Sequence, residues 1–225
     1  MNDIHKDIVQ INKIVKVYKK VIFFAGFIIL ANLISSVVDN DFANGFFSVV
    51  NPFLTLAGAS VFVRAFSGNN YILISTLPVK LNNITEIIFR LFEVTCVISY
   101  GGCCIISLMK GNYTGILSCL LLLMVTLIFG YISISALSSE QLAVWMKQVA
   151  STAKGFALYM IFFVVFMALN SLIIALFEEF KKSVLLIIFS IAGILVLTVI
   201  TFFTRRLTYQ KTYNKIRGIK TEKKA

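Results

Sequence analysis

The stretch Val184–Thr204, VLLIIFSIAGILVLTVITFFT, decides the class of this protein. Fifteen of its residues are Val, Ile, Leu or Phe, and none is charged. A helix needs about 20 mostly apolar residues to cross a bilayer core about 30 Å thick. Each large apolar residue favours the middle of the bilayer by about 0.3 to 0.6 kcal/mol, so the whole stretch favours insertion by several kcal/mol. It therefore predicts a transmembrane helix.

Five further stretches meet the same requirement of length and composition. They are Val21–Val38, Gly45–Val63, Ile87–Met109, Tyr113–Leu137 and Phe156–Phe177. Over all 225 residues, 59% are hydrophobic, 14% are charged and the mean hydropathy is +0.91. A soluble domain carries about 25% charged residues, so most of this chain is expected to dissolve in lipid. We predict an all-α, polytopic membrane protein with a six-helix transmembrane domain over residues 21–204.

The basic residues predict the orientation of these spans. In the loops that six spans create, 18 of the 21 Lys and Arg residues fall on one side, and only Lys110, Lys181 and Lys182 fall on the other. Cytoplasmic loops carry an excess of Lys and Arg. We therefore expect a multi-pass protein of the cell membrane with both termini, including a basic tail at residues 205–225, in the cytoplasm. The net charge of +11 is assigned to topology and anionic headgroups, and nucleic acid is not expected as a partner.

The first 20 residues have the pattern of an amphipathic helix. One face carries the apolar side chains, at spacings of three and four: Ile4, Ile8, Ile11, Val15 and Tyr18. Lysines fall mainly elsewhere, and a basic amphipathic helix of this kind lies in the membrane interface. We predict an interfacial helix over residues 1–20. The pattern leaves open whether this helix also transmits motion from a partner to the first span.

The loop between the second and third spans contains an apolar stretch that is too short to cross a membrane, Tyr71–Leu77. Pro78 disfavours the helical conformation at Leu77, so the chain is expected to turn there. Asn83, followed by Glu86, resembles a capping box that starts the next helix. Apolar side chains on a cytoplasmic loop need burial, and a partner surface or the membrane interface can supply it.

Four polar residues within the predicted spans are candidates for a functional role. Arg90 and Glu93 lie three residues apart on one face of a helix, so they can pair near its cytoplasmic end. This pair is either a local contact tolerated at the interface or part of a gate or substrate entry. Asn32 and Asn170 lie deeper, where an amide usually bonds to a neighbouring helix. Both amides are therefore expected to have a structural role, with a substrate site as the alternative.

Residues for catalysis or for binding a cofactor or metal are not expected in this chain. Its single histidine is His5, and no phosphate-binding loop of the Walker A type occurs. All the cysteines, Cys96, Cys103, Cys104 and Cys119, lie inside apolar runs without the spacing of a zinc site or a disulfide framework. They are predicted to be packing residues. An intramembrane enzyme is retained only as a minor alternative.

Six spans, cytoplasmic termini, an amphipathic N-terminal segment and the Leu77-Pro78-Val79 turn resemble the small type-2 permeases of ABC exporters. The resemblance in topology covers the whole chain, and at residue level it is confined to about Tyr71–Glu93. Members of this family export antimicrobial or cytolytic peptides, or confer immunity to lantibiotics. Two features depart from the family pattern: the loop Ser138–Lys154 lacks the expected proline-containing pattern, and the last external loop, Glu178–Ser183, is very short for a pair of re-entrant helices.

The resemblance implies a division of labour between subunits. ATP is hydrolysed by a separate ATP-binding cassette subunit, and this chain forms the membrane path, together with a second permease subunit in a homo- or heterodimer. Leu77, Pro78, Val79 and Lys80 would then couple the chain to the ATPase. The implied activity is export of a peptide, drug-like or lipid-like substrate. The alternative is a non-transporting membrane scaffold, immunity or sensor protein that binds through its basic tail.

Overall fold

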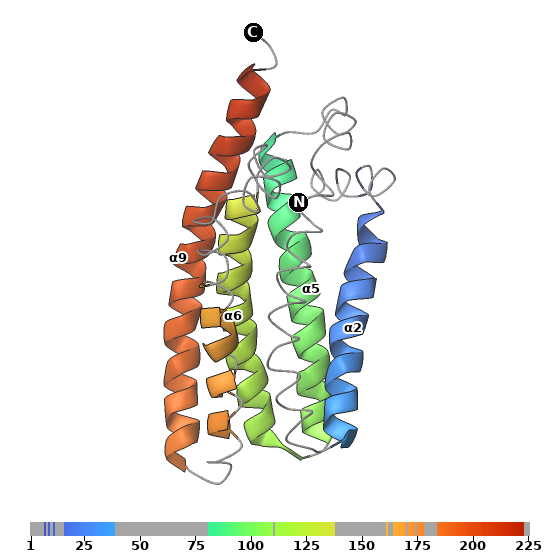
Figure 1. Ribbon diagram of the computed structural model, residues 1–225, viewed down its shortest axis with the longest axis vertical. Coiled ribbons are helices and arrows are strands. Elements are labelled where there is room, and N and C mark those ends of the chain that lie inside the picture. Colours follow the sequence, from blue (N-terminus) through green and yellow to red (C-terminus); the bar gives the residue numbers. More distant parts are fainter. Residues whose placement is uncertain are drawn as a thin grey trace.

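The computed structural model describes Asp7, Val9, Ile11 and residues 16–38, 81–109, 111–137, 161, 164–169, 171–173, 175–177 and 184–222. All regular secondary structure among these residues is helical, which confirms the all-α class for this part of the chain. The main helices are α2 (Val17–Val38), α5 (Leu81–Met109), α6 (Tyr113–Leu137) and α9 (Val184–Glu222) (Figure 1). They stand side by side with their axes nearly aligned.

Three of these helices are long and apolar enough to cross a membrane. The qualifying segments are Asn82–Met109 of α5, Tyr113–Ser135 of α6 and Val184–Asn214 of α9. They correspond to the predicted third, fourth and sixth spans, and α6 has the same first and last residues as its prediction. The predicted Val21–Val38 lies within α2. Gly45–Val63 lies outside the described residues, and Phe156–Phe177 is described only in part, so the number six stays a prediction.

The turn between α5 and α6 explains why these two helices form an antiparallel hairpin. Gly111 has a left-handed backbone with φ +67°, and its N–H bonds to the Leu108 carbonyl at 2.9 Å. The Asn112 N–H bonds to the Ser107 carbonyl at 2.9 Å, which completes a Schellman motif at the end of α5. The Asn112 side chain then caps α6, because its Oδ1 accepts the N–H of Gly115 at 3.0 Å. Gly111 and Asn112, which lie between the predicted third and fourth spans, therefore end one helix and begin the next.

The surface of α9 is inverted relative to a water-soluble helix. Phe189 and Leu195 are 70% and 65% exposed, and most other large apolar side chains between Val184 and Leu207 are exposed as well. The buried side chains are small and hydroxylated: Ser190, Thr201, Thr208 and Thr212. In water this arrangement would leave a large apolar surface exposed, whereas lipid solvates it. At 1.5 Å per residue, the 39 residues of α9 extend about 58 Å, well beyond a bilayer core.

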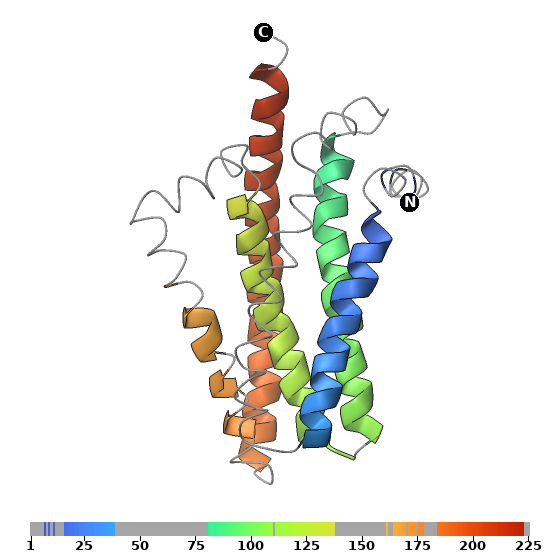
Figure 2. The same ribbon diagram turned by 45° about the vertical axis from the view of Figure 1, so that its right-hand side comes forward.

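The helices form two parallel pairs. In the first pair, Ile29 of α2 packs on Gly102 of α5, and Asp7 meets Asn83 of α5. In the second, Leu121 of α6 packs on Gly193 of α9, and further along Met124 contacts Thr201. Figures 1 and 2 show both pairs from two directions, with α5 and α6 antiparallel at the centre. Consequently the chain leaves α2 at one end of the bundle and enters α5 at the opposite end.

The apolar core lies toward the end of the bundle at which α5 begins and α6 ends. Phe89 and Phe92 of α5 are almost completely buried there, together with Tyr131 and Ile134 of α6. The Phe92 ring lies so close to the α6 backbone that a Cβ added to Gly130 would stand 1.9 Å from Phe92 Cζ. A glycine at this position therefore allows the close approach of α5 and α6.

The N-terminal segment joins this core. Asp7, Val9 and Ile11 are helical, and Ile11 is fully buried in the core cluster. Lys16, with φ +50°, separates these residues from α2. Because α2 begins at Val17, it includes Tyr18, which the sequence pattern had placed on the N-terminal helix. At Ile11, therefore, the apolar side chain packs against protein.

Candidate functional site

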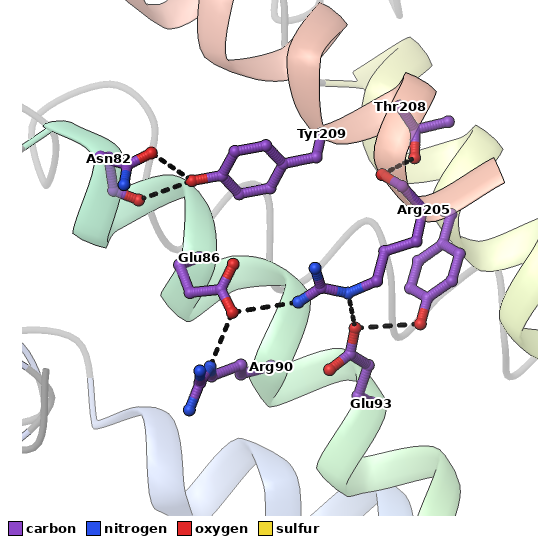
Figure 3. A network of polar contacts seen from close by, with 8 residues as sticks. Asn82, Glu86, Arg90, Glu93, Arg205, Thr208 and Tyr209 are labelled. Atoms are coloured by element: carbon purple, nitrogen blue, oxygen red, sulfur yellow. Dashed lines mark hydrogen bonds and ion pairs between the residues drawn. The ribbon is translucent and has the colours of Figure 1, made fainter. Parts of the chain in front are cut away.

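Four charged side chains meet at the end of the bundle where α5 begins, and we call them the charged cluster: Glu86, Arg90, Glu93 and Arg205 (Figure 3). The first three lie on one face of α5, because their spacings are four and three. Arg205 reaches them from α9. Its Nη2 lies 3.0 Å from Glu86 Oε1, and its Nε lies 2.6 Å from Glu93 Oε1. One guanidinium therefore bridges two carboxylates on the neighbouring helix.

Arg90 and Glu93, whose spacing allows them to pair, each bond to a different residue in the structure. Arg90 Nε donates to Glu86 Oε1 at 2.7 Å, one turn toward the N-terminus, and Glu93 is bonded to Arg205. A Glu four residues before an Arg is the favoured order for a pair within a helix, which explains the choice of Arg90. Glu93 is then available to a partner from another helix.

Tyrosine side chains extend the charged cluster in both directions. The Tyr131 hydroxyl of α6 donates to Glu93 Oε1 at 2.9 Å. The Tyr209 hydroxyl of α9 bonds to the Asn82 carbonyl at 3.2 Å and to the Asn82 side chain. Both rings pack on the buried Phe89, with centroid distances of 5.6 Å for Tyr131 and 5.7 Å for Tyr209. The charged cluster therefore connects α5, α6 and α9, and it lies next to the packed rings of Phe89, Tyr131 and Tyr209.

The charged cluster is formally neutral and partly shielded. It contains two carboxylates and two guanidiniums, and the side-chain exposures run from 18% for Glu86 and 25% for Glu93 to 32% for Arg205 and 49% for Arg90. Fully exposed ion pairs contribute about 0 to 1 kcal/mol, whereas breaking a buried pair costs about 3 to 5 kcal/mol. The bonds of Arg205 lie between these limits, and the more exposed pair of Arg90 lies nearer the lower one.

The first turn of α5 also holds the N-terminal segment. Asn83 Nδ2 donates to Asp7 Oδ2 at 2.7 Å. This contact corrects the predicted helix cap, because α5 already begins at Leu81 and Asn83 lies inside its first turn. Asn83 therefore binds the N-terminal segment, while its neighbour Asn82 binds Tyr209 of α9. Two adjacent asparagines connect the start of α5 to regions near both ends of the chain.

Only two of the residues predicted for a site are described with their side chains, Arg90 and Glu93. Leu77, Pro78, Val79 and Lys80 lie outside the described residues, as does Asn170. Asn32 belongs to α2, but its side chain is not among those described. The predicted coupling stretch nevertheless ends immediately before Leu81, the first residue of α5. The charged cluster therefore lies on the first turns of the helix that follows this stretch.

The polar contacts described in the middle of α5 and α6 join uncharged groups. Tyr100 and Thr126 share a hydroxyl–hydroxyl bond of 2.8 Å between the helices, and both are buried. Thr95 and Ser99 each donate to a backbone carbonyl four residues earlier in α5. The four cysteines are free thiols. Among the described residues, no group of three or more His, Cys, Asp or Glu side chains is arranged to hold a metal ion.

Arg205 and Tyr209 were missed by the sequence reasoning, which counted Arg205 only as a basic residue of the tail. The signal for them was the spacing of polar residues that continues past the end of the apolar run. Thr201, Arg205, Thr208 and Thr212 recur at intervals of four, three and four, so they lie on one helical face. Three of them are buried threonines, which indicates that α9 continues as a packed helix beyond Thr204.

No protein-family model matches this chain, and no match is found among curated proteins or solved structures. The resemblance based on Leu77-Pro78-Val79 therefore stays a prediction.

Proposed function

We propose that this chain is the membrane-spanning permease subunit of an ABC-type exporter, driven by an ATPase that is a separate subunit. The observation that carries the proposal is the charged cluster, which links α5 to α9 on the turns directly after the predicted coupling stretch. Ionisable side chains on membrane helices are costly, and they commonly mark transport pathways or moving contacts. In this chain Glu86 and Glu93 lie within a helix that is otherwise apolar enough to span a membrane.

The directions of the helices support six spans. Because α2 and α5 run parallel, a chain in which both cross the bilayer must cross back between them. The same reasoning applies between α6 and α9, which also run parallel. One return crossing in each connection gives six, and the sequence offers Gly45–Val63 and Phe156–Phe177 for these two crossings. An even number of spans places both termini on one side, and the distribution of Lys and Arg makes that side the cytoplasm.

The contacts of α5 offer a route for the driving force. An ATPase seated on Leu77 and Pro78 would push on the start of α5. That start is bonded to α9 through Arg205 and to the N-terminal segment through Asp7. A displacement of α5 would therefore pull on α9 and on the N-terminal segment. A subunit that is driven from its cytoplasmic face requires such a connection.

Affinity purification tests this proposal. The tagged chain, extracted from its native membranes in a mild detergent, should co-purify with an ATP-binding cassette ATPase identified by mass spectrometry. The double variant Leu77→Ala, Pro78→Ala should insert normally but lose the ATPase, because the coupling surface is gone. Deletion of residues 215–225 is the matched control and should retain the ATPase, since Arg205, Tyr209 and their contacts stay in place.

The opposite pattern would favour the scaffold or sensor alternative. In that case the chain would be isolated in a stable form without an ATPase. The deletion of residues 215–225 would then abolish its scaffold, immunity or sensor function, because binding occurs through the basic tail. Labelling of Tyr71–Lys80 from the external medium would contradict the proposed orientation directly.

A further inference from the structure

Glu86 differs from Glu93 in how its carboxylate is satisfied. Oε1 of Glu86 accepts bonds from two guanidiniums, Arg90 of its own helix at 2.7 Å and Arg205 of α9 at 3.0 Å. Oε1 of Glu93 accepts from Arg205 at 2.6 Å and from the neutral Tyr131 hydroxyl at 2.9 Å. If Arg205 withdrew, Glu86 would keep a cationic partner and Glu93 would keep a hydrogen-bond donor. Both carboxylates therefore have a substitute partner already in place.

The Arg205 side chain could be solvated after it leaves the two carboxylates. Its side chain is 32% exposed, and it lies just past the apolar part of α9, where a long cationic side chain can reach the membrane surface. Among the contacts described between the outer parts of α5 and α9, the hydrogen bond of Tyr209 with Asn82 is exposed to solvent. Separation of the two helices at this end therefore leaves no charged group of the cluster both buried and unpaired.

We propose that the bonds of Arg205 to Glu86 and Glu93 form a releasable latch between α5 and α9. Arg90 makes release possible because it remains bonded to Glu86 when Arg205 dissociates. In the closed state Arg205 joins the start of α5 to the long C-terminal part of α9. In the open state the contacts Arg90–Glu86 and Tyr131–Glu93 remain, and α9 beyond Thr204 is no longer joined to α5 by ion pairs. The latch rests on the proposed function only for its purpose, which is to regulate the response of α9 to a push on α5.

The inference predicts opposite roles for the two arginines. Removal of Arg205 breaks its two bonds to α5 and opens the latch. Removal of Arg90 leaves those bonds in place and takes away the substitute partner of Glu86, so that opening becomes harder. If the charged cluster served only to hold the fold together, the loss of either arginine would loosen it.

Hydrogen exchange of the isolated chain in lipid nanodiscs measures this difference without an ATPase. A helix detached from its neighbours is marginally stable in water, so release of α9 exposes its amides to exchange. In Arg205→Gln, amides of residues 205–214 should exchange about tenfold faster, equivalent to about 1.4 kcal/mol in the opening equilibrium. In Arg90→Gln the same amides should exchange more slowly than in the unmodified chain. Amides around Thr126 serve as the reference for global stability.

Further variants keep the test decisive. Arg206→Gln removes the adjacent, exposed arginine and should change nothing. If Arg205→Gln fails to insert, Arg205→Lys keeps the charge but cannot present a planar fork to both carboxylates, so it should accelerate exchange locally by a smaller factor. Faster exchange in Arg90→Gln, or unchanged exchange in the Arg205 variants, would overturn the inference. If the unmodified chain co-purified with no ATPase, the proposed function alone would be overturned, because no ATPase takes part in the exchange measurement.

Discussion

The charged end of the bundle and the middle of the α5–α6 interface satisfy polar side chains in different ways. At the charged end, Glu86 and Glu93 bond to guanidiniums, one of which comes from α9. In the middle, Tyr100 and Thr126 share a neutral hydrogen bond, and the hydroxyls of α5 bond to their own helix backbone. Charge is therefore used where partners from several helices and partial exposure are available.

Depth in the membrane explains this difference. A charged side chain near the bilayer centre costs about 2.5 to 3.5 kcal/mol by insertion measurements, and the cost falls toward the ends of a helix. Neutral hydrogen bonds between membrane helices contribute about 0.6 kcal/mol on average, because the separated helices find other partners. The middle of the interface thus holds the helices together with weak bonds, whereas the charged end concentrates strong, exchangeable ones.

The largest expected effect comes from placing a charge in the middle. Thr126→Asp removes the bond to Tyr100 and buries a carboxylate between α5 and α6, so the free energy of unfolding should fall by about 3 kcal/mol. The control Asn82→Asp adds the same charge in the first turn of α5, where the helix N-terminus favours it, and should change stability by less than about 0.5 kcal/mol. Unfolding by sodium dodecyl sulfate in mixed micelles measures both. Equal effects would remove the distinction between the two regions.

The next effect concerns the spacing that lets Tyr131 reach Glu93. Gly130→Ala would place its Cβ 1.9 Å from the ring of the buried Phe92, and such overpacking typically costs about 1 to 3 kcal/mol. Gly101→Ala is the matched control, since no atom lies within 4 Å of its added Cβ. The same unfolding assay should give a loss for Gly130→Ala and none for Gly101→Ala. A stable Gly130→Ala protein would show that Phe92 moves aside easily.

A smaller effect is expected when one hydroxyl is removed at the charged end. Tyr131→Phe keeps the ring contacts with Phe89 and Phe92 but leaves Glu93 without the hydroxyl donor. Hydrogen bonds to charged groups contribute about 1.5 to 3 kcal/mol. Because Arg205 still binds Glu93, the free energy of unfolding is expected to fall by about 1.5 kcal/mol in the same assay. A loss of the same size in the Glu93→Leu background, which has no acceptor for this bond, would mean that the hydroxyl acts through another residue.

The smallest effect is expected for the same substitution in the middle. Tyr100→Phe removes a neutral hydroxyl from its bond with Thr126, and the free energy of unfolding should fall by about 0.6 kcal/mol. The comparison between Tyr131→Phe and Tyr100→Phe therefore reports directly on charged against neutral partners. If Tyr100→Phe cost more than Tyr131→Phe, the charged end would not be the site of the stronger bonds.

Local sequence patterns predicted much of the fold. The bounds of α6, the tight turn after α5 and the apolar character of α9 all follow from runs of residues close together in the chain. The partner of Glu93 could not be predicted in this way, because Arg205 is 112 residues further along the chain. Asn83 likewise has the spacing of a helix cap, yet it lies within α5 and bonds to Asp7, 76 residues away.

The sequence by itself determined that this chain is built from apolar helices. Whether a segment forms a helix in lipid depends on its own hydrophobicity and length, which are local properties of the sequence. The tertiary structure alone decided that α2 lies parallel to α5 and α6 parallel to α9, and that Arg205 bridges Glu86 and Glu93. Charge pairing acts over a few ångströms in space, and a helix of given composition can present its charges to several neighbours. Which neighbour receives them is settled only when the helices pack.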